Sequence, residues 1–206
     1  MVLVIDAAHA RDCSDMLKDM HRMRKAVFVD GLGWRLPVTR DGLEIDQFDT
    51  ADAVYLLDVD AKTLCLNASV RLLPTVRPHV LGDLFDQTCD NGAPRSEDVW
   101  EISRLCTAPR LDAEAALWAR RRICLGLVEY GLLNGIDRYS CVINTSWLAG
   151  FLRPGWVCEP LGAPVEINGE TLGAFTISVS PATRQKFLDQ WRLAPLILAF
   201  PEQVAA

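Results

Sequence analysis

The segment Val99–Arg104, with the sequence Val-Trp-Glu-Ile-Ser-Arg, constrains this chain more than any other, because it puts polar side chains into an apolar strand. Successive side chains of a strand point to opposite faces. Glu101 and Ser103 therefore share one face, and Arg104 lies on the other face or at the end of the strand. Burying a charge is costly unless it is paired. The segment is either an edge strand in solvent or the floor of a site.

The order of helical and strand-like patterns predicts an α/β sandwich with a mostly antiparallel central sheet and helices on both faces. The 206 residues, 50% of them hydrophobic, suit a single domain over residues 1–206. A hairpin turn is expected at Asn168-Gly169. Strands are predicted at Val2–Ile5, Val54–Val59, Leu64–Leu73, Val99–Thr107, Tyr139–Ile143, Gly155–Cys158 and Leu172–Val179, and helices at Ala8–Val29, Val80–Phe85, Ala113–Leu133, Ser146–Leu152 and Pro181–Trp191.

Composition excludes several classes of function. The net charge of −6 argues against nucleic acid as a partner, and no apolar run is long enough to span a bilayer. The N-terminus lacks the pattern of a secretory leader, and the seven scattered cysteines form no Cys-x-x-Cys pair. Both features favour free thiols in a reducing cytoplasm. The three histidines show no helical spacing, so we predict no metal site.

A long segment, Gly31–Asp52, lacks sustained periodicity and is expected to be an ordered loop, since it contains Trp34 and Phe48. Within it, Glu44, Asp46 and Asp49 bring three carboxylates into six residues. Taken alone, such a cluster is better explained as a solvated acidic loop than as a pocket for a cation.

Arg24 and Phe28 are four residues apart and share a helix face, which alone is more typical of a surface stacking pair. In combination, the clusters resemble the acyl-homoserine-lactone synthases, the LuxI-type autoinducer synthases of bacterial quorum sensing. The resemblance covers about residues 20–110 at the level of motifs. The signature positions that match are Arg24, Phe28, Trp34, Asp46, Asp49, Arg71, Glu101 and Arg104.

The resemblance implies a fold related to the GNAT acyltransferases and two substrates, S-adenosylmethionine and an acyl thioester. The amine of S-adenosylmethionine is acylated, and its carboxylate then displaces methylthioadenosine and closes the lactone. S-adenosylmethionine is a substrate, so no cofactor is expected. The alternatives are a general GNAT-type N-acyltransferase acting on another amine, which would not need Arg24, Trp34, Asp46 and Asp49, and a sensor without activity, which would be expected to lose Glu101 or Arg104.

Six residues are candidates for binding S-adenosylmethionine. Carboxylates suit its positive groups, a guanidinium suits its carboxylate, and aromatic faces suit its adenine or sulfonium. Asp46 and Asp49 fit the first role, and Arg24 or Arg104 fits the second. The full set is Arg24, Phe28, Trp34, Asp46, Asp49 and Arg71.

The predicted catalytic residues are Glu101, Ser103 and Arg104. The ammonium of the substrate must lose a proton before it attacks a thioester, and Glu101 is the natural base. A backbone N–H between Ser103 and Cys106 is a candidate for the oxyanion. Ser103 either touches the acyl carbonyl or bonds a neighbouring strand, and its position supports both roles equally.

The acyl chain needs an apolar tunnel. In the family, a threonine on the strand before the short helix favours 3-oxo chains, and that position falls at Ile143 here. An unsubstituted, branched or aryl acyl group is therefore expected. The candidate lining residues are Leu105, Trp118, Leu125, Val142, Ile143 and Leu152.

The acyl donor stays open between acyl carrier protein and acyl-coenzyme A. The stretch Leu105–Asp112 has no glycine, and Pro109 removes an amide, which weakens a standard coenzyme A cradle. Some relatives without such a loop nevertheless use acyl-coenzyme A. An acidic carrier protein would need basic side chains, for which Arg120, Arg121 and Arg153 are the candidates, although a solvated helix face explains the arginines of the helix at least as well.

Overall fold

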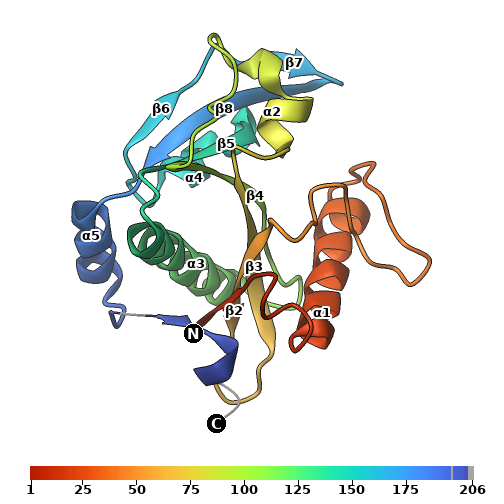
Figure 1. Ribbon diagram of the computed structural model, residues 1–206, viewed down its shortest axis with the longest axis vertical. Coiled ribbons are helices and arrows are strands. Elements are labelled where there is room, and N and C mark those ends of the chain that lie inside the picture. Colours follow the sequence, from red (N-terminus) through yellow and green to blue (C-terminus); the bar gives the residue numbers. More distant parts are fainter. Residues whose placement is uncertain (196, 204–206) are drawn as a thin grey trace. The chain divides into compact units, whose positions relative to one another are not determined.

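The computed structural model describes residues 1–195 and 197–203, which form two compact units (Figure 1). The first unit contains Met1–Arg71, Arg104–Leu127 and the C-terminal segment from Pro195. The second contains Leu72–Ser103 and Val128–Ala194. Strands β3 (Leu66–Pro74) and β4 (Val99–Thr107) and helix α3 (Ala113–Asn134) run from one unit into the other.

The first unit has a sheet in the order β4-β3-β2-β1-β9. Strand β1 (Val2–Ile5) pairs antiparallel with β2 (Val54–Val59) and parallel with the short β9 (Leu198–Ala199). Figure 1 shows α1 (Ser14–Arg24) and α3 on opposite sides of β2 and β3. Helix α1 continues directly into the π-helix η1 (Lys25–Gly31), and η4 (Pro201–Gln203) ends the described chain.

The second unit has a sheet in the order β6-β8-β5-β4-β3, and β7 also pairs with β8. Its central strand β5 (Arg138–Asn144) runs parallel to β4 and antiparallel to β8 (Glu170–Ser178). The remaining elements are β6 (Cys158–Pro160), β7 (Val165–Ile167), α2 (Val80–Leu84), η2 (Asp86–Thr88), η3 (Thr145–Trp147), α4 (Leu148–Leu152) and α5 (Pro181–Trp191).

Local sequence signals explain several of these boundaries. The Asp112 carboxylate accepts the N–H of Ala115 at 2.8 Å and caps α3. Ser180 caps α5 in the same way, and Pro181 follows as its first residue. Asn168 and Gly169 both have positive φ, 53° and 83°, which suits the two-residue turn between β7 and β8.

The predicted α/β fold is confirmed, and three element predictions are corrected. The first helix begins at Ser14 rather than Ala8, because the Asp6 carboxylate bonds the Ala8 and His9 N–H groups and holds a turn there. The strand predicted at Gly155–Cys158 begins only at Cys158, since the Gly155 N–H bonds the Leu152 carbonyl. Strand β9 was not predicted, because two residues carry no periodicity. The single-domain organisation stays a prediction.

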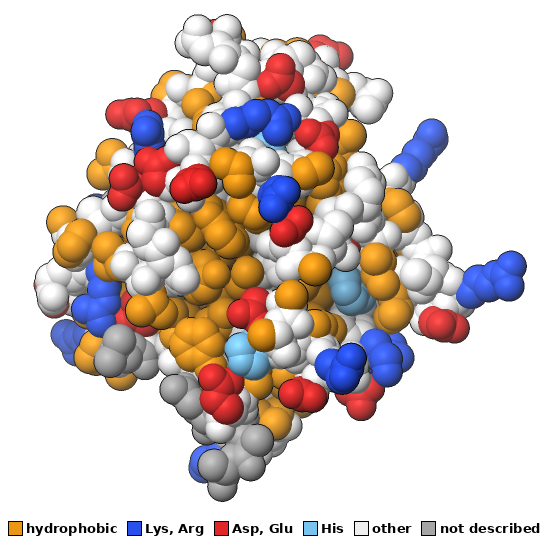
Figure 2. Space-filling model, viewed as in Figure 1, with side chains coloured by type: hydrophobic (Ala, Val, Ile, Leu, Met, Phe, Trp, Pro, Cys, Tyr) orange, Lys and Arg blue, Asp and Glu red, His pale blue; other side chains and the backbone are white. Residues whose placement is uncertain are grey.

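Charges of both signs are mixed on one face of the molecule. On the face shown in Figure 2, acidic and basic side chains are interspersed rather than gathered into one basic patch. No helix among residues 1–195 and 197–203 combines the length and apolarity needed to cross a membrane.

The close approach of α3 to β5 in the second unit depends on Gly131. A Cβ at this position would lie 2.9 Å from Val179 Cγ1 and 3.1 Å from the Tyr139 hydroxyl. We predict that Gly131→Ala lowers the free energy of unfolding by about 1–3 kcal/mol in urea denaturation, because overpacking outweighs the better helix propensity of alanine. The matched control is Gly150→Ala in α4, where nothing lies within 4 Å. Equal effects of the two substitutions would contradict this packing.

Candidate functional site

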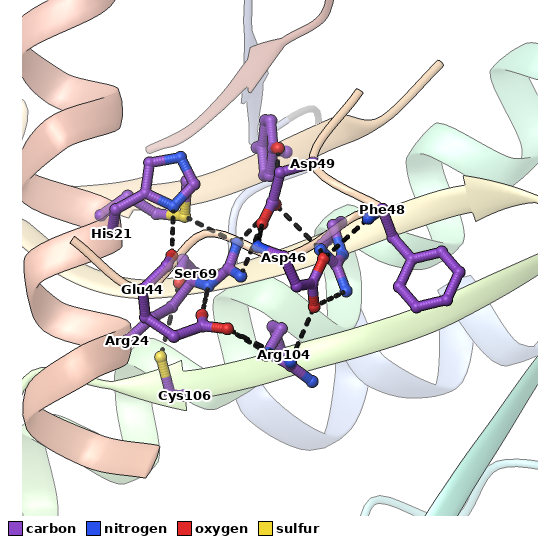
Figure 3. A network of polar contacts seen from close by, with 12 residues as sticks. His21, Arg24, Glu44, Asp46, Phe48, Asp49, Ser69, Arg104 and Cys106 are labelled. Atoms are coloured by element: carbon purple, nitrogen blue, oxygen red, sulfur yellow. Dashed lines mark hydrogen bonds and ion pairs between the residues drawn. The ribbon is translucent and has the colours of Figure 1, made fainter. Parts of the chain in front are cut away.

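Six charged side chains of the first unit form one ion-pair network (Figure 3). Its three guanidinium groups balance its three carboxylates, so the network carries no net charge. It links α1, the loop that follows η1, β3 and β4. Its members are Arg24, Glu44, Asp46, Asp49, Arg71 and Arg104.

Arg24 lies at the closed end of this network. Its side chain is fully buried, bonds Glu44 through Nε, and makes a bidentate contact with Asp49 at 2.7 and 2.9 Å. Arg71 is equally buried and contacts both Asp46 and Asp49, at 2.6 and 2.9 Å. Such pairing is what permits charges to lie in a protein interior. Arg24 and Asp49, both predicted to bind substrate, are thus engaged with each other.

Arg104 closes the network on its more accessible side. Its Nη2 atom contacts Glu44 at 3.2 Å and Asp46 at 2.7 Å, and 10% of its side chain is exposed. Its backbone has φ = 55°, a left-handed conformation that is rare for a residue other than glycine and costs about 1–3 kcal/mol. The alternation of side chains between the two faces of β4 therefore stops before Arg104, as it does at a β-bulge. The sequence pattern did not predict this irregularity.

Charge pairing sets the protonation states in the network. Burial alone would lower the pKa of Arg24, but hydrogen bonds and charges from Asp49 and Glu44 outweigh it and raise that pKa. Burial would likewise raise the pKa of Asp49, yet Arg24 and the charge of Arg71 bring it well below its usual value. Burial, followed by the charge and hydrogen bond of Asp49, raises the pKa of Tyr55. All three groups keep their ordinary charge at neutral pH.

Aromatic rings lie beside two of the arginines of the network. The Phe28 and Trp34 rings stack at 5.1 Å with an interplanar angle of 18°, and the Arg104 guanidinium lies 5.7 Å from the Phe28 centroid. Phe48, buried, has Arg71 at 5.8 Å from its ring. Phe28 belongs to η1, and such π-helical turns are frequent at functional sites. The structure thus brings together Phe28, Trp34 and Arg104, as predicted, and gives the loop its order.

Glu101 lies in the second unit and is fully buried on β4. Its Oε1 atom accepts the Leu81 N–H from the first turn of α2 at 2.8 Å. Ser140 stands opposite it on β5. Ser103 is half-buried on the same strand. A buried carboxylate held by a backbone N–H is well oriented to accept a proton.

The candidate acyl-pocket residues are divided between the units. Leu105, Trp118 and Leu125 belong to the first, and Val142, Ile143 and Leu152 to the second. Leu125 is fully buried, Val142 packs against a core cluster containing Leu81 and Ala174, and Leu152 is 40% exposed. An open cavity of about 340 Å³ in the first unit is lined by none of the six; its lining includes Val27, Leu32, Thr107 and Leu111.

The arginines of α3 have different surroundings. Arg122 binds the fully buried Asp58 at 2.6 and 2.8 Å, so it does not belong to a solvated face. Arg121 stacks over Trp118 at 4.7 Å. Arg120 and Arg153 are exposed. Only the last two project into solvent as a carrier-binding role would require.

Sequence reasoning missed three residues that complete the network. Glu44 stood out only as part of an acidic loop, although its fully buried carboxylate joins Arg24 to Arg104. Tyr55 donates its hydroxyl to Asp49 at 2.8 Å, and His21 contacts the Glu44 carbonyl at 2.8 Å. Tyr55 gave no signal in the sequence, because it lies on β2, whose residues are typical of a plain core strand.

Comparison with known proteins yields a consistent set of similarities. The family model described as "Autoinducer synthase" matches residues 8–187. The isovaleryl-homoserine lactone synthase of Bradyrhizobium diazoefficiens is 29% identical over 92% of this chain and 83% of its own length. The acyl-homoserine-lactone synthase of Pseudomonas aeruginosa is 30% identical over 84% of this chain and 83% of its own length.

Solved structures agree with these similarities. A CoA-dependent acyl-homoserine lactone synthase, BjaI, solved with SAM and isopentyl-CoA, has a TM-score of 0.89 and 28% identity over 100% of this chain and 97% of its own. An N-acetyltransferase from Lactobacillus plantarum, 17% identical over 87% of this chain and 99% of its own, has a TM-score of 0.59, which shows a shared fold alone.

Because Asp49 is paired in the interior, removing its charge is predicted to destabilise the protein strongly. We expect Asp49→Asn to lower the free energy of unfolding by about 3–5 kcal/mol, because Arg24 and Arg71 lose a charged partner in the interior. Asp19→Asn is the control, since Asp19 pairs with Arg22 on the surface and both are more than half exposed; a change of less than about 1 kcal/mol is expected there. Urea denaturation measures both variants.

The lowered pKa of Asp49 determines how the stability of the protein changes with pH. This contribution to stability is complete above the carboxyl pKa of the unfolded chain, about 3.9, and is lost as the pH falls through the lower folded-state pKa. The free energy of unfolding of wild type should therefore exceed that of Asp49→Asn throughout the range from pH 7 to pH 5. Loss of this difference within that range would contradict the pairing.

Proposed function

The chain belongs to the autoinducer synthase family, and we propose that it makes an acyl-homoserine lactone from S-adenosylmethionine and a short, branched acyl-coenzyme A. As an acyl-homoserine-lactone synthase it is an acyltransferase. The observation that carries the proposal is the similarity over the whole chain to BjaI, a CoA-dependent synthase. The curated relative from Bradyrhizobium diazoefficiens, named for an isovaleryl product, supports the branched chain.

The proposed reaction has two steps. The amine nitrogen of S-adenosylmethionine attacks the thioester carbonyl, an amide forms, and the thiol of the donor leaves with a proton. The substrate carboxylate then attacks the carbon next to the sulfonium, so the carbon–sulfur bond breaks and neutral methylthioadenosine leaves as the lactone closes. We propose that no cofactor takes part, since the substrate supplies both nucleophile and leaving group.

We assign S-adenosylmethionine to the accessible edge of the ion-pair network. Arg104 is the least buried of its three guanidinium groups, and it lies beside the Phe28 and Trp34 rings. It is therefore the candidate for the substrate carboxylate, and Asp46, at 2.7 Å from it, for a positive group. Arg24, Asp49 and Arg71, which are engaged with one another in the interior, hold this edge in place.

Glu101 is the proposed general base for the ammonium group. The Leu81 N–H holds one carboxylate oxygen, which fixes the direction of the other. Ser103 keeps both of its roles, contact with the acyl carbonyl or a bond within the sheet. The cytoplasm is the proposed compartment, since all seven cysteines are free thiols.

The donor proposal departs from the expectation that the glycine-free stretch after β4 favours a carrier protein. The Ala108 N–H bonds the Asn67 carbonyl and the Leu111 N–H bonds the Ala108 carbonyl, so this stretch offers few amides to a pyrophosphate. The similarity to a CoA-dependent synthase outweighs that argument, because BjaI resembles this chain over its full length.

The donor assignment predicts a clear order of rates. With S-adenosylmethionine fixed, methylthioadenosine release is expected to have a kcat/KM at least about tenfold higher with isovaleryl-coenzyme A than with the same acyl group on acyl carrier protein. It is also expected to exceed the rate with a 3-oxo-acyl-coenzyme A, since Ile143 has no hydrogen-bonding group. Mass spectrometry identifies the lactone. If methylthioadenosine is released with none of these acyl donors, the proposed synthase activity is refuted. A preference for acyl carrier protein would refute only the assignment of coenzyme A as the carrier.

The base assignment predicts a loss in kcat. Glu101→Gln keeps the shape and the acceptor for the Leu81 N–H but cannot take a proton. We expect kcat to fall by about 10²–10⁴-fold, with the KM for S-adenosylmethionine within about threefold of wild type. Ser103→Ala serves as the neighbouring control, with a much smaller loss expected. Near-full turnover of Glu101→Gln at neutral pH would exclude Glu101 as the base.

A further inference from the structure

We propose that His21 is a positioning residue for S-adenosylmethionine, because it fixes the backbone of Glu44 and, through the Glu44 carboxylate, the guanidinium of Arg104. This inference rests on the synthase activity and on the assignment of the substrate carboxylate to Arg104. His21 stands outside the residues that the family motif singled out.

Two reciprocal hydrogen bonds join His21 to Glu44. The His21 Nδ1 atom lies 2.8 Å from the Glu44 carbonyl oxygen, and the Glu44 N–H bonds the His21 carbonyl at 3.3 Å. A carbonyl oxygen only accepts, so Nδ1 carries the proton of this contact. Figure 3 shows the imidazole of His21 directed at Glu44, at the point where the long loop returns to α1. His21 thus contacts both backbone polar groups of Glu44, the carbonyl through its side chain and the N–H through its own backbone carbonyl.

The position of Glu44 decides the position of Arg104. The Glu44 carboxylate is fully buried and bonds Arg24 through Oε2 and Arg104 through Oε1. Arg104 adopts a left-handed backbone conformation, which is unfavourable by itself and needs side-chain contacts to persist. A shift of the Glu44 backbone would move Oε1 away from Nε and Nη2 of Arg104, both at 3.2 Å.

His21 also supports the opposite side of the network. Its ring meets the Tyr55 ring edge-on, with centroids 6.2 Å apart and planes at 77°. The Tyr55 hydroxyl in turn donates to Asp49 at 2.8 Å. His21 is buried, with 8% of the residue exposed, and burial, together with the charge of Arg24, lowers its pKa. A neutral imidazole that donates from Nδ1 therefore contacts the backbone of Glu44 on one side and, on the other, the ring of the tyrosine that bonds Asp49.

Two substitutions of His21 distinguish the contribution of its Nδ1–H hydrogen bond from that of its aromatic ring. His21→Phe keeps an aromatic ring against Tyr55 but removes the Nδ1–H group, and it leaves the Glu44 carbonyl without that donor. His21→Asn loses the ring but offers an amide N–H at a similar distance from the backbone. His9→Phe is the matched control, because His9 is a half-buried histidine that pairs with Asp6 and lies outside the network.

The test measures the Kd of S-adenosylmethionine by calorimetry without acyl donor, and then KM for each substrate from methylthioadenosine release. We expect His21→Phe to raise the Kd and KM for S-adenosylmethionine about tenfold or more, with the KM for the acyl donor unchanged. His21→Asn is expected to stay within about threefold of wild type, and His9→Phe to match it. In an Arg104→Gln background, His21→Phe should add little, since the two act through one contact.

Three results would overturn the proposal. The first is wild-type affinity for S-adenosylmethionine in His21→Phe. The second is an equal loss in His21→Asn and His21→Phe, which would assign the effect to packing of the ring. The third is full additivity with Arg104→Gln. Failure of the synthase activity is a separate outcome, because wild-type chain that binds no S-adenosylmethionine contradicts the proposed function before any variant is compared.

Discussion

The pairing of three arginines, two of them fully buried, with three carboxylates is the interaction on which the first unit depends. Charges are tolerated in an interior only when each has a close partner, and losing one partner costs more than the pair itself contributes. Arg24, Asp49 and Arg71 satisfy one another out of contact with water. This arrangement ties a long loop without regular structure to α1, β3 and β4. The loop owes its order to charge pairing rather than to backbone ladders.

The members of the network differ in burial, and this difference separates side chains that support the network from the one that faces solvent. The innermost side chains have the greatest burial and the closest contacts, whereas Arg104 remains partly exposed beside aromatic rings. An enzyme gains from a binding group whose position is fixed before the substrate arrives, since less freedom is lost on binding. Glu101, three residues earlier on β4, receives its orientation from a different source, the N–H of Leu81. The proposed base and the proposed substrate-binding arginine are thus held by different contacts.

Much of this was readable from sequence, for identifiable reasons. Val2–Ile5, Val54–Val59 and Pro181–Trp191 have clear periodicity or caps, and their predicted bounds are confirmed. The resemblance to the synthase family singled out Arg24, Phe28, Trp34 and Arg104, which the fold does bring together. The roles of Glu44 and His21 could not be read in this way, because both depend on contacts between residues more than twenty positions apart. The left-handed backbone of Arg104 left no local signature either, since no glycine marks it.

The central claim is that a preassembled network presents Arg104 to the substrate carboxylate. A crystal structure with bound S-adenosylmethionine tests it most directly. We expect the substrate carboxylate within about 3 Å of the Arg104 guanidinium, with the Arg24–Asp49 and Arg24–Glu44 pairs unchanged. A structure in which Arg24 releases Asp49 and itself binds the substrate carboxylate would contradict the account, because the buried pairs would then be a resting state rather than a scaffold.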